Sequence, residues 1–200
     1  MTSKNDSYHH GNLRDSLIDV AIEILQAEGK SGIKMREIGK RIGVSQSAAY
    51  RHFSDKSALL AAVATRGFDK LTDELRTVRN SQYSSLVEQV EQMGVIYIIF
   101  AVEHAAQYRL MYGTEAIRSD EYPELAQATR NMAREYFRMV KRCQEAGLMK
   151  GQSPIELLNV MWSATHGAAM LVIDGFIKTD DVEQFARNVV NYVDTGIRKL

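Results

Sequence analysis

The stretch from Met35 to Phe53, MREIGKRIGVSQSAAYRHF, constrains the fold of this chain most. Ile38 and Ile42 lie four residues apart, as on one face of a helix, and Gly43 then allows the positive φ that a sharp turn needs. Ser45 follows at a position where its hydroxyl can cap a second helix. The pattern predicts a helix-turn-helix, a unit that reads the major groove of DNA. An ordinary helical hairpin with a glycine turn is the alternative.

The predicted second helix has two distinct faces. Ala49 and Phe53 recur at helical spacing and are expected to point inward, which leaves small, polar and basic side chains outward. Gln46 has the geometry for a bidentate contact to adenine, and Arg36 for a contact to guanine or a phosphate. The alternative for both residues is an ordinary solvated helix face.

Composition and charge place the chain among globular proteins. The hydrophobic content is 45%, and the 25 Lys and Arg residues balance the 25 Asp and Glu residues. The charge is uneven, with 11 basic and 8 acidic residues in 1–70 against 14 and 17 in 71–200. This distribution favours a DNA-facing N-terminal part and argues against a protein that coats nucleic acid by charge alone.

The cysteine content and the apolar runs predict a compartment. Cys143 is the single cysteine, so no internal disulfide forms and a reducing compartment is expected. The polar N-terminus lacks a signal-peptide core, and the run Val95–Val102 is far shorter than a membrane span. We therefore predict a cytoplasmic protein without membrane partners.

Helical periodicity without strand-like alternation predicts an all-α fold. Besides the helix-turn-helix, helices are expected over about 13–29, 55–80, 84–111, 123–147, 153–173 and 181–200. The predicted domains are a DNA-binding head with an N-terminal arm over 1–54, a connecting helix over 55–80, and a helical effector-binding and dimerisation body over 81–200. Lys4, Tyr8, His9 and His10 of the arm add DNA contacts or form a disordered terminus.

The segment GIKMREIGKRIGVSQSAAYRHFSDKSALLAAV resembles the N-terminal domain of the tetracycline-repressor (TetR/AcrR) family of bacterial regulators. WSATHG at Trp162–Gly167 and YRLMYG at Tyr108–Gly113 resemble the C-terminal domain type named for its Trp-His-Gly motif. The resemblance implies a homodimeric, ligand-responsive transcription regulator, more often a repressor, on a pseudo-palindromic operator. Lys34 stands where many relatives have a capping Ser or Thr, and its ammonium can reach a phosphate instead.

These observations together give three sets of candidate residues. The candidate DNA-contacting residues are Lys34, Arg36, Ser45, Gln46, Ser47, Ala48, Tyr50, Arg51, His52 and Lys56. The candidate effector-pocket residues, for which an ordinary core is the alternative, are Tyr97, Phe100, His104, Met111, Trp162, His166 and Met170. The resemblance implies a dimer interface, whose candidate residues are Gly167, Ala168, Leu171, Phe185, Val189 and Val193.

The sequence offers little for an enzyme. Ser163, His166 and Asp174 lie on or near one helix, and such a spacing makes neither a catalytic triad nor an oxyanion site. The histidines lack metal-ligand spacing, and no phosphate-cradling glycine pattern occurs. We therefore predict no catalytic residue, no metal and no cofactor, with a small-molecule effector of unknown identity. An architectural DNA-binding protein without an effector is a second alternative.

Overall fold

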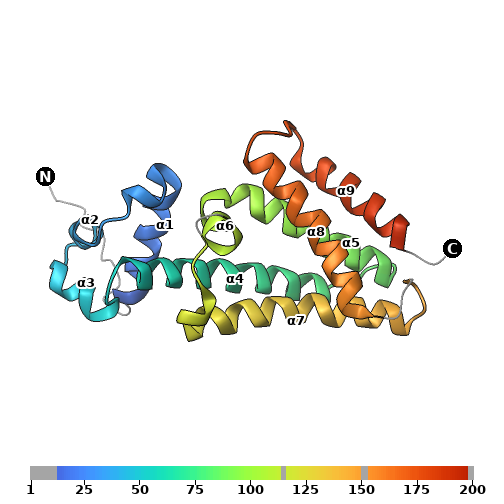
Figure 1. The fold of residues 1–200 in the computed structure, drawn as a ribbon, viewed down its shortest axis with the longest axis horizontal. Coiled ribbons are helices and arrows are strands. Elements are labelled where there is room, and N and C mark those ends of the chain that lie inside the picture. The colour runs from blue at the N-terminus through green and yellow to red at the C-terminus, as the bar shows by residue number, and fades with distance from the viewer. Residues whose placement is uncertain (1–12, 114–115, 150–152, 198–200) are drawn as a thin grey trace, which may run out of the picture.

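The computed structural model describes residues 13–113, 116–149 and 153–197, and within these ranges the chain is built from α-helices (Figure 1). The predicted all-α fold class is confirmed, whereas the predicted N-terminal arm with Lys4, Tyr8, His9 and His10 lies outside the described residues. The helices are α1 (Leu13–Gly32), α2 (Met35–Arg41), α3 (Gln46–His52), α4 (Lys56–Asn80), α5 (Leu86–Glu103), α6 (Ala105–Tyr112), the short 3-10 helix η1 (Ser119–Glu121), α7 (Pro123–Glu145), α8 (Pro154–Ile173) and α9 (Val182–Ile197).

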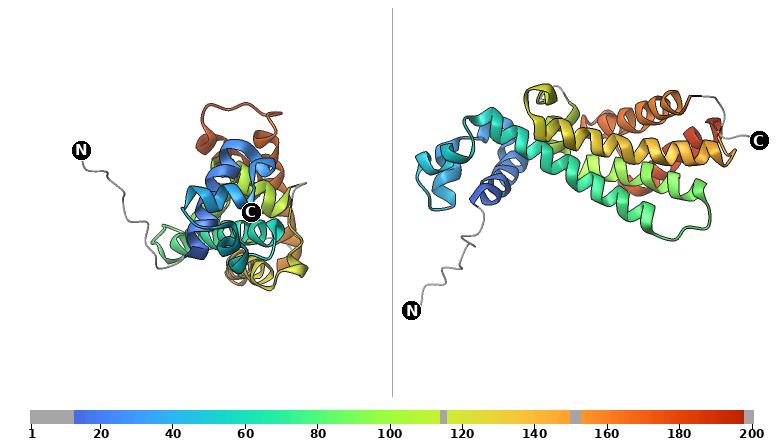
Figure 2. Two further views of the ribbon diagram at one scale, coloured as in Figure 1. Left: turned by 90° about the vertical axis from the view of Figure 1, so that its left-hand side faces the viewer. Right: turned by 90° about the horizontal axis from the view of Figure 1, so that it is seen from below.

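Helices α1, α2 and α3 form a small head at one end of the long helix α4, whose other part packs against α5, α6 and α7 (Figures 1 and 2). Helices α8 and α9 pack against α5. The turn between α2 and α3 follows the predicted pattern, with Gly43 at φ +73°. Ser45 caps α3, since its hydroxyl accepts from the backbone N–H of Ala48 at 3.2 Å. Ala49 and Phe53 are buried beneath α3, so the predicted helix-turn-helix is confirmed.

Helix α4 connects the head to the body. It packs most extensively along α7, and at its other end against α1. The carboxylate of Glu135 on α7 is only 3% exposed and forms ion pairs with Arg76 and Arg79 on α4 and with Arg138 on its own helix. This buried carboxylate therefore joins the two longest helices of the chain by charge as well as by apolar contact.

The predicted long helix over 84–111 is wrong in one respect, because it is two helices. His104 adopts φ −114° and ψ 37° between α5 and α6, which redirects the chain. Tertiary contacts account for the break: the ring of His104 lies 2.8 Å from the Lys70 ammonium of α4, and Gln107 donates to the Val63 carbonyl at 2.8 Å. Helix α6 thereby lies across α4.

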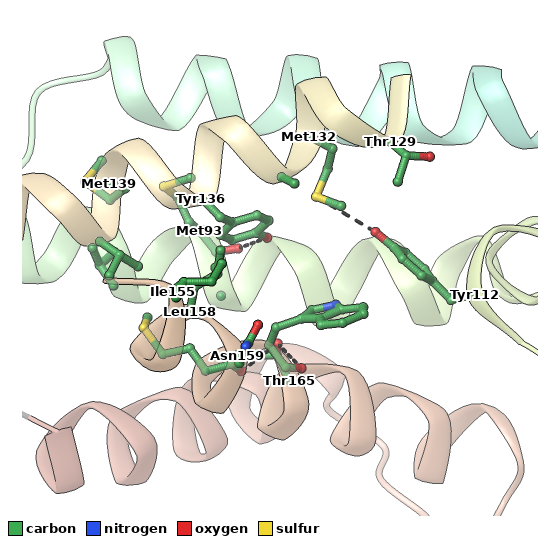
Figure 3. A pocket seen from close by; sticks show the side chains of 16 residues that line it. Met93, Tyr112, Thr129, Met132, Tyr136, Met139, Ile155, Leu158, Asn159 and Thr165 are labelled. Atoms are coloured by element: carbon green, nitrogen blue, oxygen red, sulfur yellow. Dashed lines mark hydrogen bonds between the residues drawn. The ribbon is translucent and has the colours of Figure 1, made fainter. Parts of the chain in front are cut away.

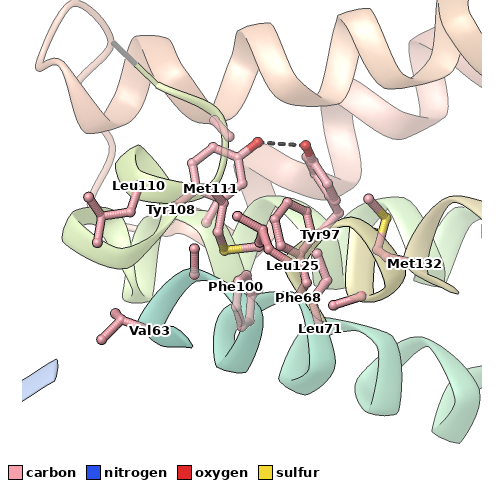
Figure 4. Packing of buried hydrophobic residues seen from close by; sticks show 14 of the residues in the cluster. Val63, Phe68, Leu71, Tyr97, Phe100, Tyr108, Leu110, Met111, Leu125 and Met132 are labelled. Carbon is pink, nitrogen blue, oxygen red and sulfur yellow. Dashed lines mark hydrogen bonds between the residues drawn. The ribbon is translucent and has the colours of Figure 1, made fainter. Parts of the chain in front are cut away.

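The apolar core of the body forms where α5 and α6 meet α4 (Figure 4). Tyr97, Phe100 and Tyr108 are almost completely buried there. Gly67 of α4 permits the close approach of α6, because a Cβ at this position would lie 2.6 Å from the sulfur of Met111. The core thus links α6 tightly to the half of α4 that carries the head.

Candidate nucleic-acid interface and body cavity

The head exposes one polar and basic surface. Along α3 the exposed side chains belong to Gln46, Ser47, Tyr50, Arg51 and His52, and Tyr50 is 43% exposed. At the start of α2, Lys34 and Arg36 are also exposed. This surface fits a DNA contact, since a short helix with outward polar and basic side chains suits the major groove.

Three of the predicted DNA-contacting residues have structural roles. Ala48 is 7% exposed and faces the interior of the head, so its methyl group is not presented to a base and that prediction is wrong. Ser45 uses its hydroxyl to cap α3. The ammonium of Lys56 donates to the Lys30 carbonyl at 2.7 Å, at the end of α1, and the side chain is half-buried. This contact fastens α4 to α1, and the phosphate contact of Lys56 stays a prediction.

Replacing Lys56 by methionine tests this role, because methionine keeps an unbranched apolar stem and removes the donor. We expect Lys56→Met to lower the free energy of unfolding by about 1.5 kcal/mol, the lower end of the range for a hydrogen bond that involves a charged group. Urea denaturation measures the change, with Lys40→Met on the exposed face of α2 as the control. Unchanged stability together with a reduced salt dependence of DNA binding would restore the phosphate role.

A cavity of about 250 Å³ lies in the body between α5, α7 and α8, with Tyr112 of α6 at one end (Figure 3). Its lining is largely apolar and contains four methionines and three aromatic side chains. The lining residues are Val90, Met93, Gly94, Tyr112, Thr129, Met132, Ala133, Tyr136, Met139, Val140, Ile155, Leu158, Asn159, Met161, Trp162 and Thr165. Of the seven predicted pocket residues, Trp162 alone is among them.

The other predicted pocket residues lie elsewhere. Phe100 and Met111 are buried in the core beside α4, and His104 contacts Lys70 on the far side of α5. Met170 is half-buried against the core. The prediction was wrong for these four residues because helical spacing shows that a face is buried without showing which helix covers it. In α5, Val90, Met93 and Gly94 line the cavity, whereas Tyr97 and Phe100 are buried in the core beside α4 and α6.

Tyr97 and His166 stand one layer behind the cavity wall in a chain of hydrogen bonds. The indole N–H of Trp162 donates to the Tyr97 hydroxyl at 2.8 Å. The Tyr97 hydroxyl lies 2.6 Å from the Tyr108 hydroxyl, and the Tyr108 hydroxyl lies 2.6 Å from Nδ1 of His166. An indole nitrogen can only donate, so each donor in turn finds an acceptor if His166 Nδ1 carries no proton. Burial raises the pKa of Tyr97 to about 12 and lowers the pKa of His166, which keeps all four groups neutral.

These histidines predict how stability depends on pH. Burial lowers the pKa of His166, and burial followed by the Lys70 charge lowers the pKa of His104, below the usual value of 6.5. As the pH falls, the unfolded chain therefore binds protons that the native state does not. The free energy of unfolding should be highest above about pH 6.5 and should decrease as the pH drops below this value. Thermal melts at pH 7.5 and 5.5, roughly a unit to either side of the histidine pKa, measure this change.

The variants His166→Gln and His104→Gln serve as the comparison, since an amide oxygen can still accept at each position but does not titrate in this range. Each should flatten the decline in melting temperature between neutral and mildly acidic pH. The assignment fails if both variants lose as much stability as the wild type on acidification.

The α7 contribution to the cavity escaped the sequence interpretation. Thr129, Met132, Tyr136, Met139 and Val140 recur at helical spacing on an otherwise charged helix. That stripe indicates a buried face, and its methionines and hydroxyls distinguish it from a purely aliphatic core. The signal was present, but its neighbour across the cavity could not be inferred from spacing.

The predicted dimer residues lie on two helices, α8 and α9, and differ in exposure. Ala168 is 8% exposed and packs inside its own chain, so its assignment to a dimer interface is wrong. Leu171 is 44% exposed, and a Cβ at Gly167 would meet no atom within 4 Å. The α9 residues Phe185, Val189 and Val193 are each half-buried, and the first two pack against the core.

The side chains considered for a triad are engaged separately. His166 is hydrogen-bonded to Tyr108, whereas Asp174 forms an ion pair with Arg109 at 2.7 Å. The described ranges contain no cluster of three or more side chains suited to hold a metal ion. In the same ranges, every helix is too short or too polar to cross a membrane.

A helix-turn-helix head joined to a helical body that contains a cavity is the architecture of a DNA-binding transcription regulator. The family model described as "Bacterial regulatory proteins, tetR family" matches residues 17–63, and the model described as "Tetracyclin repressor-like, C-terminal domain" matches residues 90–193. The second match covers more than half of the chain, and the protein belongs to the tetracycline-repressor (TetR) family of bacterial regulators. The Trp-His-Gly subtype of the body stays a prediction.

Known relatives agree with this assignment. An HTH-type transcriptional regulator of Staphylococcus aureus strain MRSA252 is 29% identical over 94 residues. The match spans 46% of this chain and only 50% of the length of that relative. A solved structure of a protein of unknown function from Rhodococcus sp. RHA1 has a TM-score of 0.85 and 27% identity over 97% of this chain and 100% of its own. The ketosteroid transcriptional regulator KstR2 of Mycobacterium tuberculosis shares the fold, with a TM-score of 0.70 and 17% identity over 96% of this chain and 98% of its own.

Proposed function

We propose that this protein is a ligand-responsive repressor that binds a pseudo-palindromic operator as a homodimer. The observation that carries this proposal is the exposed face of α3, where Gln46, Ser47 and Arg51 point outward from a helix fixed by the Ser45 cap and by Phe53. Base-reading side chains need such a rigid support, because they must keep their position relative to the groove.

A second copy of the chain fits the open face of α8. Val160 and Leu171 are 54% and 44% exposed, and Gly167 lies between them on the same side of the helix. Phe176, after α8, and Tyr192, on α9, are 79% and 78% exposed. Exposed large apolar side chains on two neighbouring helices are typical of an interaction surface, and two-fold symmetry would place two heads on two half-sites.

The cavity offers a place for the effector, and Tyr112 connects it with α4. Tyr112 lines the cavity and also packs edge-on against Phe68 of α4, with the ring centroids 5.1 Å apart. A molecule that displaces Tyr112 therefore disturbs the helix that carries the head. Its effect on operator binding is limited to its differential affinity for the two arrangements of the heads.

The oligomeric part of the proposal is tested by Gly167→Arg. The position faces open space in the single chain, and arginine has a better helix propensity than glycine, so the fold should persist. Analytical ultracentrifugation should show dimers for the wild type and for Gln127→Arg, a control on the exposed face of α7, and monomers for Gly167→Arg. Monomers of the wild type at micromolar concentration would contradict the dimer.

A further inference from the structure

The cavity between α5, α7 and α8 has an unusual lining for its position among charged helices. None of its sixteen lining residues is Asp, Glu, Lys, Arg or His. Glu135 lies beside Tyr136 in the sequence, yet its carboxylate turns towards Arg76 and Arg79 of α4. We propose that the effector of this protein is an uncharged, mainly apolar molecule with one neutral hydrogen-bond acceptor, which the Tyr112 hydroxyl recognises. This inference rests on the ligand-responsive function proposed above.

The absence of charged residues from the lining disfavours a charged group inside the cavity, whose exposed lining residues Ala133, Ile155 and Asn159 mark an opening to solvent. A carboxylate or ammonium group transferred from water into an apolar site without a partner loses far more hydration energy than the site returns. The lining hydroxyls cannot compensate, because Tyr136 donates to the Met93 carbonyl at 3.2 Å and Thr129 to the Leu125 carbonyl at 2.9 Å. Thr165 likewise donates to the backbone of its own helix, to the Met161 carbonyl at 3.0 Å.

Tyr112 differs from these hydroxyls in its acceptor. Its O–H donates to the sulfur of Met132 at 3.9 Å, and a thioether is a weak acceptor (Figure 3). The same hydroxyl also interacts with the hydroxyl of Tyr97. A carbonyl or ether oxygen in the cavity would be a better acceptor than this sulfur. Burial raises the pKa of Tyr112 well above its usual value, so the hydroxyl remains a donor at neutral pH.

The volume of the cavity limits the size of the ligand, and its methionines allow ligands of several related shapes. A dry cavity of about 150 Å³ holds benzene, so by proportion the 250 Å³ here suit a molecule of about ten non-hydrogen atoms. Met93, Met132, Met139 and Met161 are unbranched and polarisable, which lets the wall adapt to related skeletons and contact aromatic rings. The inferred ligands are therefore small aromatic or alicyclic ketones and ethers.

Three probes of nearly equal shape test the inference. Acetophenone carries a carbonyl acceptor, α-methylstyrene replaces that oxygen with a methylene group, and benzoate carries a charge. Binding is measured on the full chain without DNA, by calorimetry and by the fluorescence of Trp162, the only tryptophan, which lines the cavity. We expect acetophenone to bind at least about tenfold more tightly than benzoate, and about threefold to tenfold more tightly than α-methylstyrene.

Two variants locate the interactions. In Tyr112→Phe the advantage of acetophenone over α-methylstyrene should disappear while both still bind, because only the hydroxyl is lost. Ala133→Phe, which places a ring at the exposed mouth of the cavity on α7, should weaken binding of both, and Gln127→Phe, an exposed residue of the same helix outside the lining, should not. Equal or tighter binding of benzoate, an advantage that survives in Tyr112→Phe, or no binding of acetophenone to the wild type would each overturn the inference.

A separate measurement distinguishes this inference from the proposed function. If acetophenone binds as expected but leaves the affinity for operator DNA unchanged, the ligand class stands for the cavity and ligand-responsive repression fails. If a charged molecule releases the protein from the operator, and Ala133→Phe prevents that molecule from binding, repression is ligand-responsive and the inferred ligand class is wrong.

Discussion

Phe53→Ala should lower the free energy of unfolding by about 3–5 kcal/mol, the range for truncating a buried phenylalanine. Phe53 is 3% exposed and directly follows α3 as its C-cap, and the guanidinium of Arg14 lies over its ring, 5.4 Å from the centroid. The loss combines the removal of apolar contacts with a cavity that the small head cannot close. Urea denaturation measures it directly.

The control for this prediction is Phe137→Ala on α7, where the side chain is 37% exposed and the same truncation should cost much less. Phe53→Ala should also weaken binding to every DNA sequence, because α3 loses the contact that fixes its direction. A loss of stability no larger than that of Phe137→Ala would mean that Phe53 does not anchor the head.

Gln46→Ala should reduce affinity for the preferred operator by about 1–3 kcal/mol and leave affinity for random DNA nearly unchanged. Gln46 opens α3 and is exposed, so it is placed to contact a base edge, and its removal costs only the sequence-specific part of binding. Titrations of labelled duplexes at one fixed salt concentration measure both affinities.

Lys34→Ala provides the contrast, because an exposed lysine before α2 is expected to contact a phosphate. It should weaken operator and random DNA alike and reduce the slope of log affinity against log salt by about one. Equal losses on both kinds of DNA for Gln46→Ala would remove it from the base-reading residues.

Local signals in the sequence were sufficient for the head. The positive φ of Gly43, the cap of Ser45 and the inward position of Phe53 each depend on residues within one or two turns of the chain. Lys56 shows the limit of this reasoning, because its partner is a carbonyl 26 residues earlier in the sequence. A basic side chain near a helix start looks the same in the sequence whether it contacts a phosphate or a neighbouring helix.

The body was predictable as helices and not as a cavity. Periodicity shows that a face is buried, but it does not show which helix covers it. For the centre of α5, residues 95–102, which is apolar on all sides, the side facing α7 could not be told from the side facing α4. No glycine or proline at His104 indicates the helix break in the sequence, because contacts with α4 produce this break.

The most direct test of the account is the selection of bound sequences from a random duplex pool with the purified full chain at physiological salt. A dimer whose α3 helices read the major groove predicts a two-fold symmetric consensus with two half-sites about one helical turn apart, or a multiple of it. The same selection with Gln46→Ala should lose preference at one base pair in each half-site. No consensus, with binding that vanishes as salt rises, would contradict the sequence-reading role and favour an architectural DNA-binding protein.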